Sequence, residues 1–422
     1  MAPYYFPLDP ACRSVAGGIE AGSKITFRVF AESAVRCEFL LREEKTGETQ
    51  SFLMERRNGA FECTVQPENI GLYWYLFSVD GRLFGSDGKL FGSFSDPGEY
   101  LLLVYRRGFV TPDWIKGGII YQIFPDRFCR SRIPDPTGMV GGRTVHQNWE
   151  EAPEYRPDHK GEVRNRDFFG GDFRGVMEKL DYLKGLGVET LYFNPIFEAA
   201  ENHRYGTADY SKVDPMLGTN EDFSKLCDEA HKRGMRVILD GVFNHTGFVS
   251  RYFNGDGFYP DVGASQSWDS PYRPWFNFIQ WPKKYESWWG IYSLPAVNES
   301  NPDYRNFIFG GDDSVVRRWL RAGADGWRLD VASEVDDGFW RAFRKAVKEI
   351  GPDVLLIGEV WESAGHWLQG DMFDSTMNYD FRKHCNLFFA EQSIDASDFA
   401  GRITDMLMRY RMQMTPAQMN LL

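Results

Sequence analysis

Two carboxylates stand at the ends of two successive apolar runs, at a spacing that suits paired acid chemistry. Asp330 lies near the end of the run 326–331, and Glu359 directly follows the run 353–358. One strand–helix–strand unit separates them. Neighbouring parallel strands lie roughly 5 Å apart, so the two carboxyl groups can reach the ~5–5.5 Å separation of retaining glycosidases. That chemistry uses one ionised carboxylate as nucleophile and one protonated carboxyl as acid.

The surroundings of the two carboxyl groups are predicted to differ. Arg328 lies two residues before Asp330 on the same strand face, and its charge would keep Asp330 ionised. Glu359 follows an apolar run and precedes Trp361, surroundings expected to raise its pKa and keep it protonated. Taken alone, Asp330 with Arg328 could be an ordinary ion pair, and Glu359 could be a neighbour of a helix N-cap.

Further polar side chains follow two earlier predicted strands. Asp240, Asn244 and His245 come at the end of one strand, and Tyr205 lies in the segment 202–210 after another. The carboxyl ends of parallel strands face a common site. Asp240 and Asn244 could instead cap backbone groups, and His245 could be a core histidine. Their occurrence in order at successive strand ends favours one shared site.

The elements that must position these residues alternate between strand and helix beyond about residue 109. Such units with short connections predict an α/β fold, either a closed barrel or a doubly wound sheet. No GxGxxG or GxxxxGK[ST] loop follows a strand, which disfavours a doubly wound nucleotide enzyme. Strands are predicted at 118–124, 188–193, 236–240, 326–331, 353–358 and 377–380, and the start of a seventh strand at 418–422. Helices are predicted at 173–184, 221–232, 314–321 and 339–349, and a long last helix follows the strand 377–380 and reaches about Tyr410.

The first 105 or so residues have a different pattern, that of antiparallel β structure. Alternating segments at 24–30, 60–65 and 73–79 are separated by turn signals such as Asn58-Gly59 and Asp80-Gly81. Short alternating strands with glycine-containing turns predict a β-sandwich.

Composition disfavours several kinds of partner. Sixty acidic residues against 48 basic ones give a formal net charge of −12, which argues against nucleic acid and anionic membrane. There is no apolar stretch of about 18 residues for a membrane span and no secretory signal pattern. The six cysteines are scattered without CxxC spacing, so a cytoplasmic, reduced protein without zinc or disulfides is predicted. Aromatic residues make up 16%, and loop-like stretches such as Ser287-Trp288-Trp289-Gly290 suit the flat faces of sugars as well as they suit a core.

Three segments together resemble the signature regions of the α-amylase superfamily, glycoside hydrolase family 13. They are Asp240-Gly-Val-Phe-Asn-His245, Gly326-Trp-Arg-Leu-Asp-Val-Ala332 and Gly358-Glu-Val-Trp361. The segments 121–128, 203–210 and 213–218 are similar to the neopullulanase, cyclomaltodextrinase and maltogenic-amylase branch. The resemblance covers residues from about 115 onward.

The resemblance implies a retaining hydrolase of α-1,4-glucosidic bonds in maltodextrins, cyclodextrins or pullulan. By it, Asp330 is the nucleophile and Glu359 the acid/base. Arg328 would orient the nucleophile, His245 would bind sugar hydroxyls and Tyr205 would stack on the sugar. The residues expected to contact substrate are Arg328, His245, Tyr205, Asp240, Asn244 and Trp361.

The resemblance also implies the architecture. A (β/α)8 TIM barrel, incomplete here with about strands 1–7, would follow an N-terminal antiparallel β-sandwich. The boundaries predicted are 1–108 for the sandwich, 109–245 for the first part of the barrel, 246–304 for a small domain inserted after strand 3, and 305–422 for the rest of the barrel. Homodimerisation through the N-terminal domain is a family expectation.

The sequence departs from the family pattern in ways that matter for chemistry. A third catalytic Asp in a His-Asp pair is expected just after a segment like Asn420-Leu421-Leu422, so this chain is predicted to be C-terminally truncated and to lack it. The alternative function is therefore an inactive glucan-binding fragment. The family's segment Met-Pro-Lys appears as Leu294-Pro-Ala, so substrate preference does not carry over.

The calcium loop of the branch is also altered. Its Asn- and Asp-rich half is replaced by Cys129-Arg-Ser-Arg-Ile133, whereas Gly170 and Asp172 fit its other half. No cofactor is expected to be required, and Gly170 and Asp172 are the candidates for a calcium site.

Overall fold

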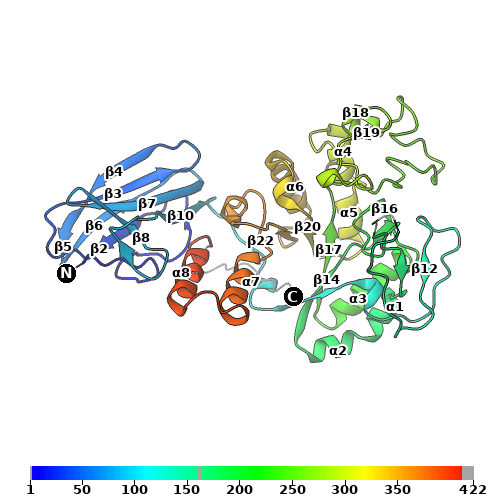
Figure 1. The fold of residues 1–422 in the computed structure, drawn as a ribbon, viewed down its shortest axis with the longest axis horizontal. Helices are drawn as coiled ribbons and strands as arrows, with labels where there is room; N and C mark the ends of the chain where they lie inside the picture. Colours follow the sequence, from blue (N-terminus) through cyan, green and yellow to red (C-terminus); the bar gives the residue numbers. More distant parts are fainter. Residues whose placement is uncertain (1, 160, 162, 411–422) are drawn as a thin grey trace. The chain divides into compact units, whose positions relative to one another are not determined.

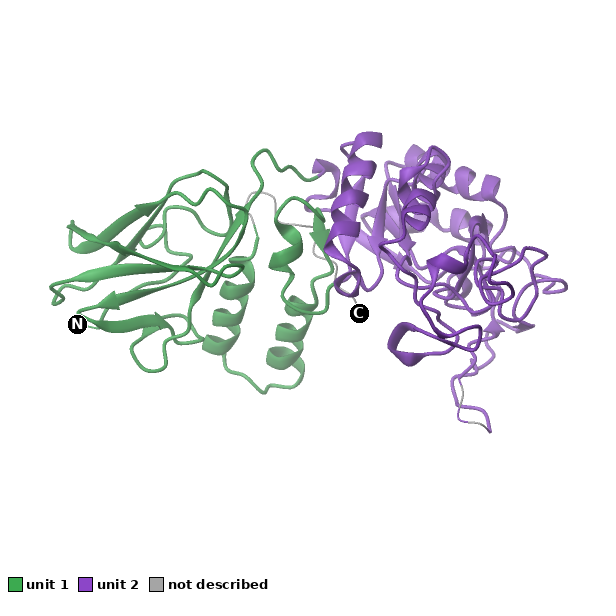
Figure 2. Cartoon of the chain, turned by 90° about the horizontal axis from the view of Figure 1, so that it is seen from above, with its two compact units in different colours: residues 1–111, 360–422 green, residues 112–359 purple. Residues whose placement is uncertain are grey.

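The computed structural model describes residues 2–159, 161 and 163–410. The chain divides into two compact units, drawn in different colours in Figure 2. The first unit takes residues 1–111 together with the residues from 360 onward, and the second takes residues 112–359.

The N-terminal part of the first unit is a β-sandwich, as predicted. One sheet has the order β1-β10-β7-β3-β4, with β8 on β7 and β9 on β8, and the other has the order β2-β6-β5. The strands are β1 (Ile19–Glu20), β2 (Ile25–Val29), β3 (Cys37–Glu43), β4 (Thr49–Leu53), β5 (Glu55–Arg57), β6 (Ala60–Val65), β7 (Gly71–Val79), β8 (Arg82–Ser86), β9 (Gly92–Ser93) and β10 (Tyr100–Tyr105).

Alternating burial explains why these segments pair face to face. In β2 and β7 every second side chain is buried, so each strand gives one apolar face to the space between the sheets. Phe27 of β2 stacks on Phe39 of β3 with ring centroids 4.4 Å apart, and Tyr75 of β7 lies 4.8 Å from Phe27. The sandwich core is therefore aromatic, and part of the aromatic excess in the sequence is structural.

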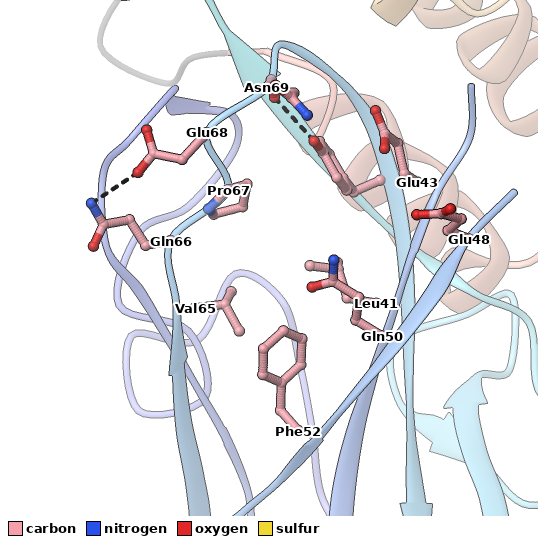
Figure 3. Close-up of a pocket in the computed structure, with 11 residues that line it drawn as sticks. Leu41, Glu43, Glu48, Gln50, Phe52, Val65, Gln66, Pro67, Glu68 and Asn69 are labelled. Carbon is pink, nitrogen blue, oxygen red and sulfur yellow. Dashed lines mark hydrogen bonds between the residues drawn. The ribbon is translucent and has the colours of Figure 1, made fainter. Parts of the chain in front are cut away.

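A cavity of about 320 Å³ opens beside this core (Figure 3). Phe52 and Val65 form its apolar floor, and the loop after β6 closes one side, where the Tyr73 hydroxyl donates to the carbonyl of Asn69 at 3.1 Å. Its remaining lining is largely polar and includes the three carboxylates Glu43, Glu48 and Glu68. The other lining residues are Leu41, Gln50, Gln66 and Pro67.

The second unit is built on a parallel sheet of order β11-β14-β17-β20-β21 (Figure 1). Each strand neighbours the next one along this series, which is the arrangement of a (β/α)8 barrel. Its strands are mostly buried on both faces, as parallel strands covered by helices must be. They are β11 (Ile119–Ile123), β14 (Val188–Phe193), β17 (Arg236–Gly241), β20 (Gly326–Leu329) and β21 (Leu355–Gly358).

The helices of this unit begin at recognisable capping residues. Thr219 and Asp222 form a reciprocal capping box at α3, and the Asp336 side chain accepts the amide of Phe339 at α6. The helices are α1 (Phe173–Glu178), α2 (Leu180–Gly185), α3 (Asn220–Lys232), α4 (Pro302–Arg305), α5 (Val315–Arg321) and α6 (Asp337–Ile350). The predicted helix 173–184 is broken in two, because Lys179 leaves helical geometry with φ −104° and ψ 0°.

Smaller elements complete the second unit. Strand pairs β12–β13, β15–β16 and β18–β19 lie outside the parallel sheet, the last of them in the segment 246–304. Their bounds are β12 (Thr144–Val145), β13 (Asp167–Phe168), β15 (Phe197–Ala199), β16 (Thr207–Val213), β18 (Phe278–Gln280) and β19 (Lys284–Tyr285).

Residues 379–407 of the first unit are mainly helical, and here two predictions are wrong. The strand predicted at 377–380 is instead the short β22 (Ser375–Thr376), and α7 (Tyr379–Cys385) starts at the predicted strand's end, capped by Asn378. The single long helix is divided into α7 and α8 (Ala396–Leu407), because Asp395 caps a new helix. The predicted strand 418–422 lies outside the described residues. No helix in the described part of the chain is long and apolar enough to cross a membrane.

Candidate active site

One guanidinium gathers three carboxylates at the carboxyl end of the parallel sheet. Arg328 Nη1 lies 2.8 Å from Asp240 Oδ1 and 2.7 Å from Asp330 Oδ1, and its Nη2 lies 2.7 Å from Glu359 Oε1. The register of β17 on β20 sets this geometry, since Asp240 is directly opposite Arg328. All four residues are buried. The structure thus brings together four residues that the sequence predicted for one site, namely Asp240, Arg328, Asp330 and Glu359.

The charges in this cluster do not balance when every group is ionised. Three carboxylates face one guanidinium away from water, so burial opposes full ionisation. The pKa of Asp330 is raised to about 8: desolvation is the largest cause, Arg328 opposes it, and the charges of Asp240 and Glu359 add to it. The expectation that Arg328 alone would keep Asp330 ionised is therefore wrong about the net direction, because it left out burial and the neighbouring Asp240.

Two tyrosines of the barrel interior bind the same Asp240. The hydroxyl of Tyr192 donates to Asp240 Oδ2 at 2.5 Å, and the hydroxyl of Tyr205 donates to the same oxygen at 3.0 Å. Asn194 Nδ2 donates to the Tyr205 hydroxyl at 3.0 Å. Tyr192 and Asn194 were not predicted from the sequence, because they stand at the end of the buried strand β14 and directly after it, where no pattern distinguishes them from core residues.

The backbone between the two catalytic candidates is strained. Val331 has φ +40° and ψ +44°, a left-handed conformation that a β-branched residue rarely adopts. Its N–H donates to Glu359 Oε2 at 3.0 Å, and the Glu359 N–H donates to the carbonyl of Leu329 at 2.9 Å. Strain of this kind is concentrated at functional sites. Here it turns an amide toward the second oxygen of Glu359.

His245 is buried with one ring nitrogen unsatisfied. Asn244 Nδ2 lies 3.2 Å from His245 Nδ1, but within the described residues no hydrogen-bond partner faces Nε2. Burial lowers the pKa of His245 to about 4, so the imidazole is neutral near pH 7. A buried neutral nitrogen without a partner suits a ligand hydroxyl.

The stretch 287–290 forms an aromatic platform held by a carboxylate. The indole of Trp288 stacks on the His245 ring, with centroids 5.4 Å apart and planes 22° apart, and Trp289 stacks on Trp288 at 5.2 Å. Their Nε1 atoms donate to the two oxygens of Glu334 at 2.8 and 2.9 Å. Trp289 is 69% exposed. Glu334, four residues after Asp330, was not foreseen, because nothing in the sequence shows that it faces the loop 287–290.

Three residues predicted for a site remain: Trp361, Gly170 and Asp172. Trp361 belongs to the first compact unit and is 41% exposed. Gly170 and Asp172, the candidate calcium ligands, stand just before α1, and the side chain of Asp172 caps that helix by accepting the amide of Gly175 at 2.6 Å. Among the described residues there is no group of three or more His, Cys, Asp or Glu side chains arranged to hold a metal ion.

Comparison with known proteins agrees with this architecture. Residues 122–421 match the family described as "Alpha amylase, catalytic domain". The chain is 36% identical to an amylopullulanase of Thermoanaerobacterium saccharolyticum over 98% of this chain and 37% of that protein. It is 41% identical to neopullulanase 2 of Thermoactinomyces vulgaris over 77% of this chain and 52% of that protein. A cyclic α-maltosyl-(1→6)-maltose hydrolase of Arthrobacter globiformis, solved without ligand, superposes with a TM-score of 0.61 at 38% identity, over 73% of this chain and 64% of that one.

A parallel sheet of this order with buried acids at its carboxyl end defines the class of (β/α)8 barrel proteins, whose sites lie at that face. Within this class, the chain belongs to the α-amylase family, glycoside hydrolase family 13. The family predicted from the sequence motifs is thus confirmed. The chain spans about half or less of the length of the curated relatives named above.

Proposed function

We propose that the protein hydrolyses α-1,4-glucosidic bonds of maltodextrins, cyclodextrins or pullulan with retention of configuration. The observation that carries this proposal is the pair Asp330 and Glu359, bound side by side to one guanidinium. Retaining enzymes place their two carboxyl groups about 5–5.5 Å apart, without room for a water between them, and two carboxyl groups held by the two terminal nitrogens of one guanidinium suit that arrangement. The names of the relatives, an amylopullulanase and a neopullulanase, support the substrate class.

In the first step, a carboxylate oxygen of Asp330 attacks the anomeric carbon. A covalent bond forms there while the bond from that carbon to the glycosidic oxygen breaks, and Glu359 gives its proton to the leaving oxygen. In the second step, Glu359 takes a proton from water, and the hydroxide formed attacks the same carbon and releases Asp330. Arg328 and Val331 each hold one oxygen of Glu359, so they fix the orientation of the carboxyl group that gives its proton.

Other side chains supply sugar contacts in this proposal. His245 Nε2 would bind a sugar hydroxyl, Tyr205 would stack against the sugar at the cleaved bond, and the Trp288–Trp289 platform would carry a neighbouring glucose ring. Stacking on indole uses the apolar face of a sugar and leaves its hydroxyls in water.

The test uses the complete protein encoded by the gene, incubated with chromogenic maltooligosides and followed by NMR of the product's anomeric configuration. Release of an α-anomer first supports the proposal, whereas a β-anomer contradicts the retaining mechanism. Tight glucan binding without turnover would favour the alternative, a glucan-binding protein without catalysis.

The carboxylate cluster predicts a particular pH dependence. Because the pKa of Asp330 is raised, the ionised nucleophile forms only as pH rises, and the acid limb of kcat/KM is expected well above about 4, where an ordinary carboxyl titrates. Asp240→Asn removes a negative charge that raises this pKa, so the limb should move to lower pH by about one unit. The measurement is kcat/KM against pH, with the exposed Glu349→Gln as control. A limb that stays in place, or moves up, would refute the electrostatic argument.

The aromatic platform predicts a binding effect. Glu334→Gln keeps the size of the side chain but leaves one indole N–H without an acceptor, so the platform should loosen. We expect KM for maltooligosides to rise about 5- to 10-fold with kcat nearly unchanged, the pattern of lost uniform binding. Steady-state kinetics of this variant and of Trp289→Ala give the comparison. Opposite behaviour, a fall in kcat at constant KM, would place Glu334 in the chemical step instead.

We also propose that the protein works in the cytoplasm. A relative in Bacillus subtilis is named intracellular maltogenic amylase, which supports this proposal. The free cysteines of the described chain fit a reducing compartment. Homodimerisation through the N-terminal domain stays a prediction of the family resemblance.

A further inference from the structure

The loop where the family resemblance implies calcium is crossed by an arginine side chain. Arg130 Nη1 donates to the carbonyl oxygens of His146 at 2.8 Å and Phe169 at 3.2 Å, and its Nη2 donates to the carbonyl of Gln147 at 2.7 Å. The guanidinium also lies over the ring of Trp149 at 5.5 Å. Backbone carbonyls of this kind are the oxygen ligands that calcium takes.

Both oxygens of the carboxylate that could join such a site already accept hydrogen bonds. Asp172 Oδ1 accepts the amide of Gly175 at 2.6 Å. Its Oδ2 accepts both the amide of Ser131 at 3.1 Å and the Ser131 hydroxyl at 2.7 Å. Asp172 therefore ties α1 to the residue next to Arg130, and only 4% of Asp172 is exposed to solvent.

The second candidate calcium ligand, Gly170, uses its backbone N–H in a hydrogen bond to a carboxylate. Its N–H donates to Asp126 Oδ1 at 3.0 Å, and Asp126 Oδ2 accepts the amide of Phe169 at 3.0 Å and Arg127 Nε at 2.8 Å. Asp126 is completely buried. Asp172 is thus bound by amide and hydroxyl groups of the chain itself and Asp126 by amides and Arg127, so the residues present do not fit a calcium ion.

We propose that the guanidinium of Arg130 takes the place of that divalent cation. Calcium would link carbonyl and carboxylate oxygens of separate segments; Arg130 links the carbonyls of 146–147 and 169 to its own segment with a permanent charge and a planar fork of donors. A divalent cation entering here would meet a positive group 2.7–3.2 Å from the same oxygens. The inference rests on these contacts and is independent of the proposed glucan chemistry.

The experiment measures thermal unfolding of the complete protein in excess EDTA and in excess calcium chloride. The expected result is the same midpoint in both for the natural sequence. Arg130→Gln, which removes the charge and part of the fork, should lower the midpoint by about 5 °C. Arg130→Lys, a point charge without the fork, should recover only part of that loss.

Arg132→Gln is the matched control, because Arg132 lies in the same loop and is exposed. It should leave the midpoint unchanged. Amide hydrogen exchange over 144–149 and 167–172 should accelerate in Arg130→Gln and not in the control. A midpoint of the natural protein that falls in EDTA and is restored by calcium overturns the proposal, as does an Arg130→Gln protein indistinguishable from the control.

Discussion

Replacing Asp330 with Asn is expected to reduce cleavage of maltooligosides by about 10⁴-fold or more, with the fold intact. The amide keeps the shape of the carboxylate and can still accept from Arg328, but it cannot form the ester to the anomeric carbon. Asp240 cannot take over that role without moving, because it is bound by Tyr192, Tyr205 and Arg328. Single-turnover kinetics together with isothermal titration of maltooligosaccharide separate lost chemistry from lost binding.

Glu359→Gln should behave differently, and the difference identifies the roles. Losing the proton donor costs about 10²- to 10⁴-fold with a natural glucan, whose leaving oxygen needs that proton. A glucosyl substrate with a strongly acidic leaving group needs little protonation, so the variant should regain much of its rate in the first step. Asp330→Asn should gain nothing from such a substrate.

Glu349→Gln serves as the reference, since Glu349 is an exposed carboxylate on α6. Thermal unfolding of all three variants checks that each is folded. The assignment fails when Asp330→Asn turns over at the natural rate, or when the activated substrate rescues Asp330→Asn and not Glu359→Gln.

Much of this site could be predicted from the sequence because the ends of the buried parallel strands can be recognised in it. Apolar runs of four to six residues ending in Asp or Glu mark buried parallel strands, and such strands align their ends at one face. Asp240, Arg328, Asp330 and Glu359 were found this way. Their mutual distances depend on strand register, which alternation does not give, and so the sharing of Arg328 among three acids was not foreseen.

Other features depend on contacts between segments that no local pattern records. Tyr192 reads as an ordinary core residue of β14, and only the fold places its hydroxyl on Asp240. Burial affects the pKa of Asp330 more than Arg328 does. Burial depends on how the site is packed, so the direction of this pKa shift could not be predicted from the sequence. The break between α7 and α8 is different, because a local signal for it is present in the sequence. Asp395 is a typical helix N-cap, but the helical pattern on both sides of it led to the prediction of one continuous helix.

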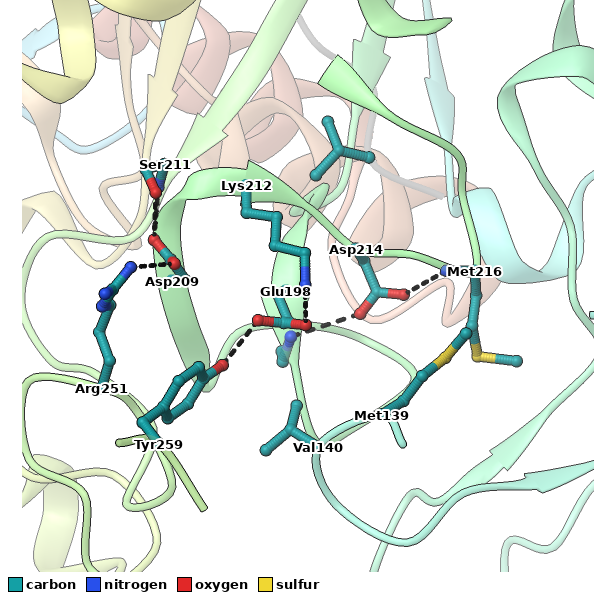
Figure 4. A network of polar contacts seen from close by, with 12 residues as sticks. Met139, Val140, Glu198, Asp209, Ser211, Lys212, Asp214, Met216, Arg251 and Tyr259 are labelled. Carbon is teal, nitrogen blue, oxygen red and sulfur yellow. Dashed lines mark hydrogen bonds and ion pairs between the residues drawn. The ribbon is translucent and has the colours of Figure 1, made fainter. Parts of the chain in front are cut away.

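A second large effect is expected at Asp214, a buried aspartate outside the Asp240–Asp330–Glu359 cluster that is paired with Arg143 and Arg204. Asp214 accepts from Arg143 Nη1 at 2.8 Å and from Arg143 Nη2 at 2.7 Å, and Arg204 Nη2 lies 3.4 Å away. The amide of Met216 also donates to Asp214 Oδ1, at 3.0 Å, and Figure 4 shows this contact. All three charged side chains are inaccessible to solvent. Arg204 directly precedes Tyr205, so this pair also anchors the loop that reaches Asp240.

Asp214→Asn should lower the stability of the fold by about 3–5 kcal/mol, because it leaves two guanidinium groups buried with their counter-charge removed. In thermal unfolding this corresponds to a fall of about 10 °C in Tm. Asp313→Asn is the matched control: Arg318 Nη2 lies 2.7 Å from Asp313, the same distance, but this aspartate side chain is 77% exposed. An exposed pair contributes about 0–1 kcal/mol, so the control should unfold almost as the natural protein does.

The pH dependence of the same variant gives an independent check. Burial alone would raise the pKa of Asp214, but Arg204 and Arg143 outweigh it and lower the pKa to about 2. A carboxyl with a depressed pKa stabilises the fold above its unfolded value of about 3.9, and this contribution is lost as pH falls toward the folded value. The stability gap between the natural protein and Asp214→Asn should therefore be constant near neutral pH and narrow between about pH 4 and pH 2. A gap that is small at pH 7, or that widens in acid, would mean that the Arg143–Asp214 pair does not hold this part of the barrel together.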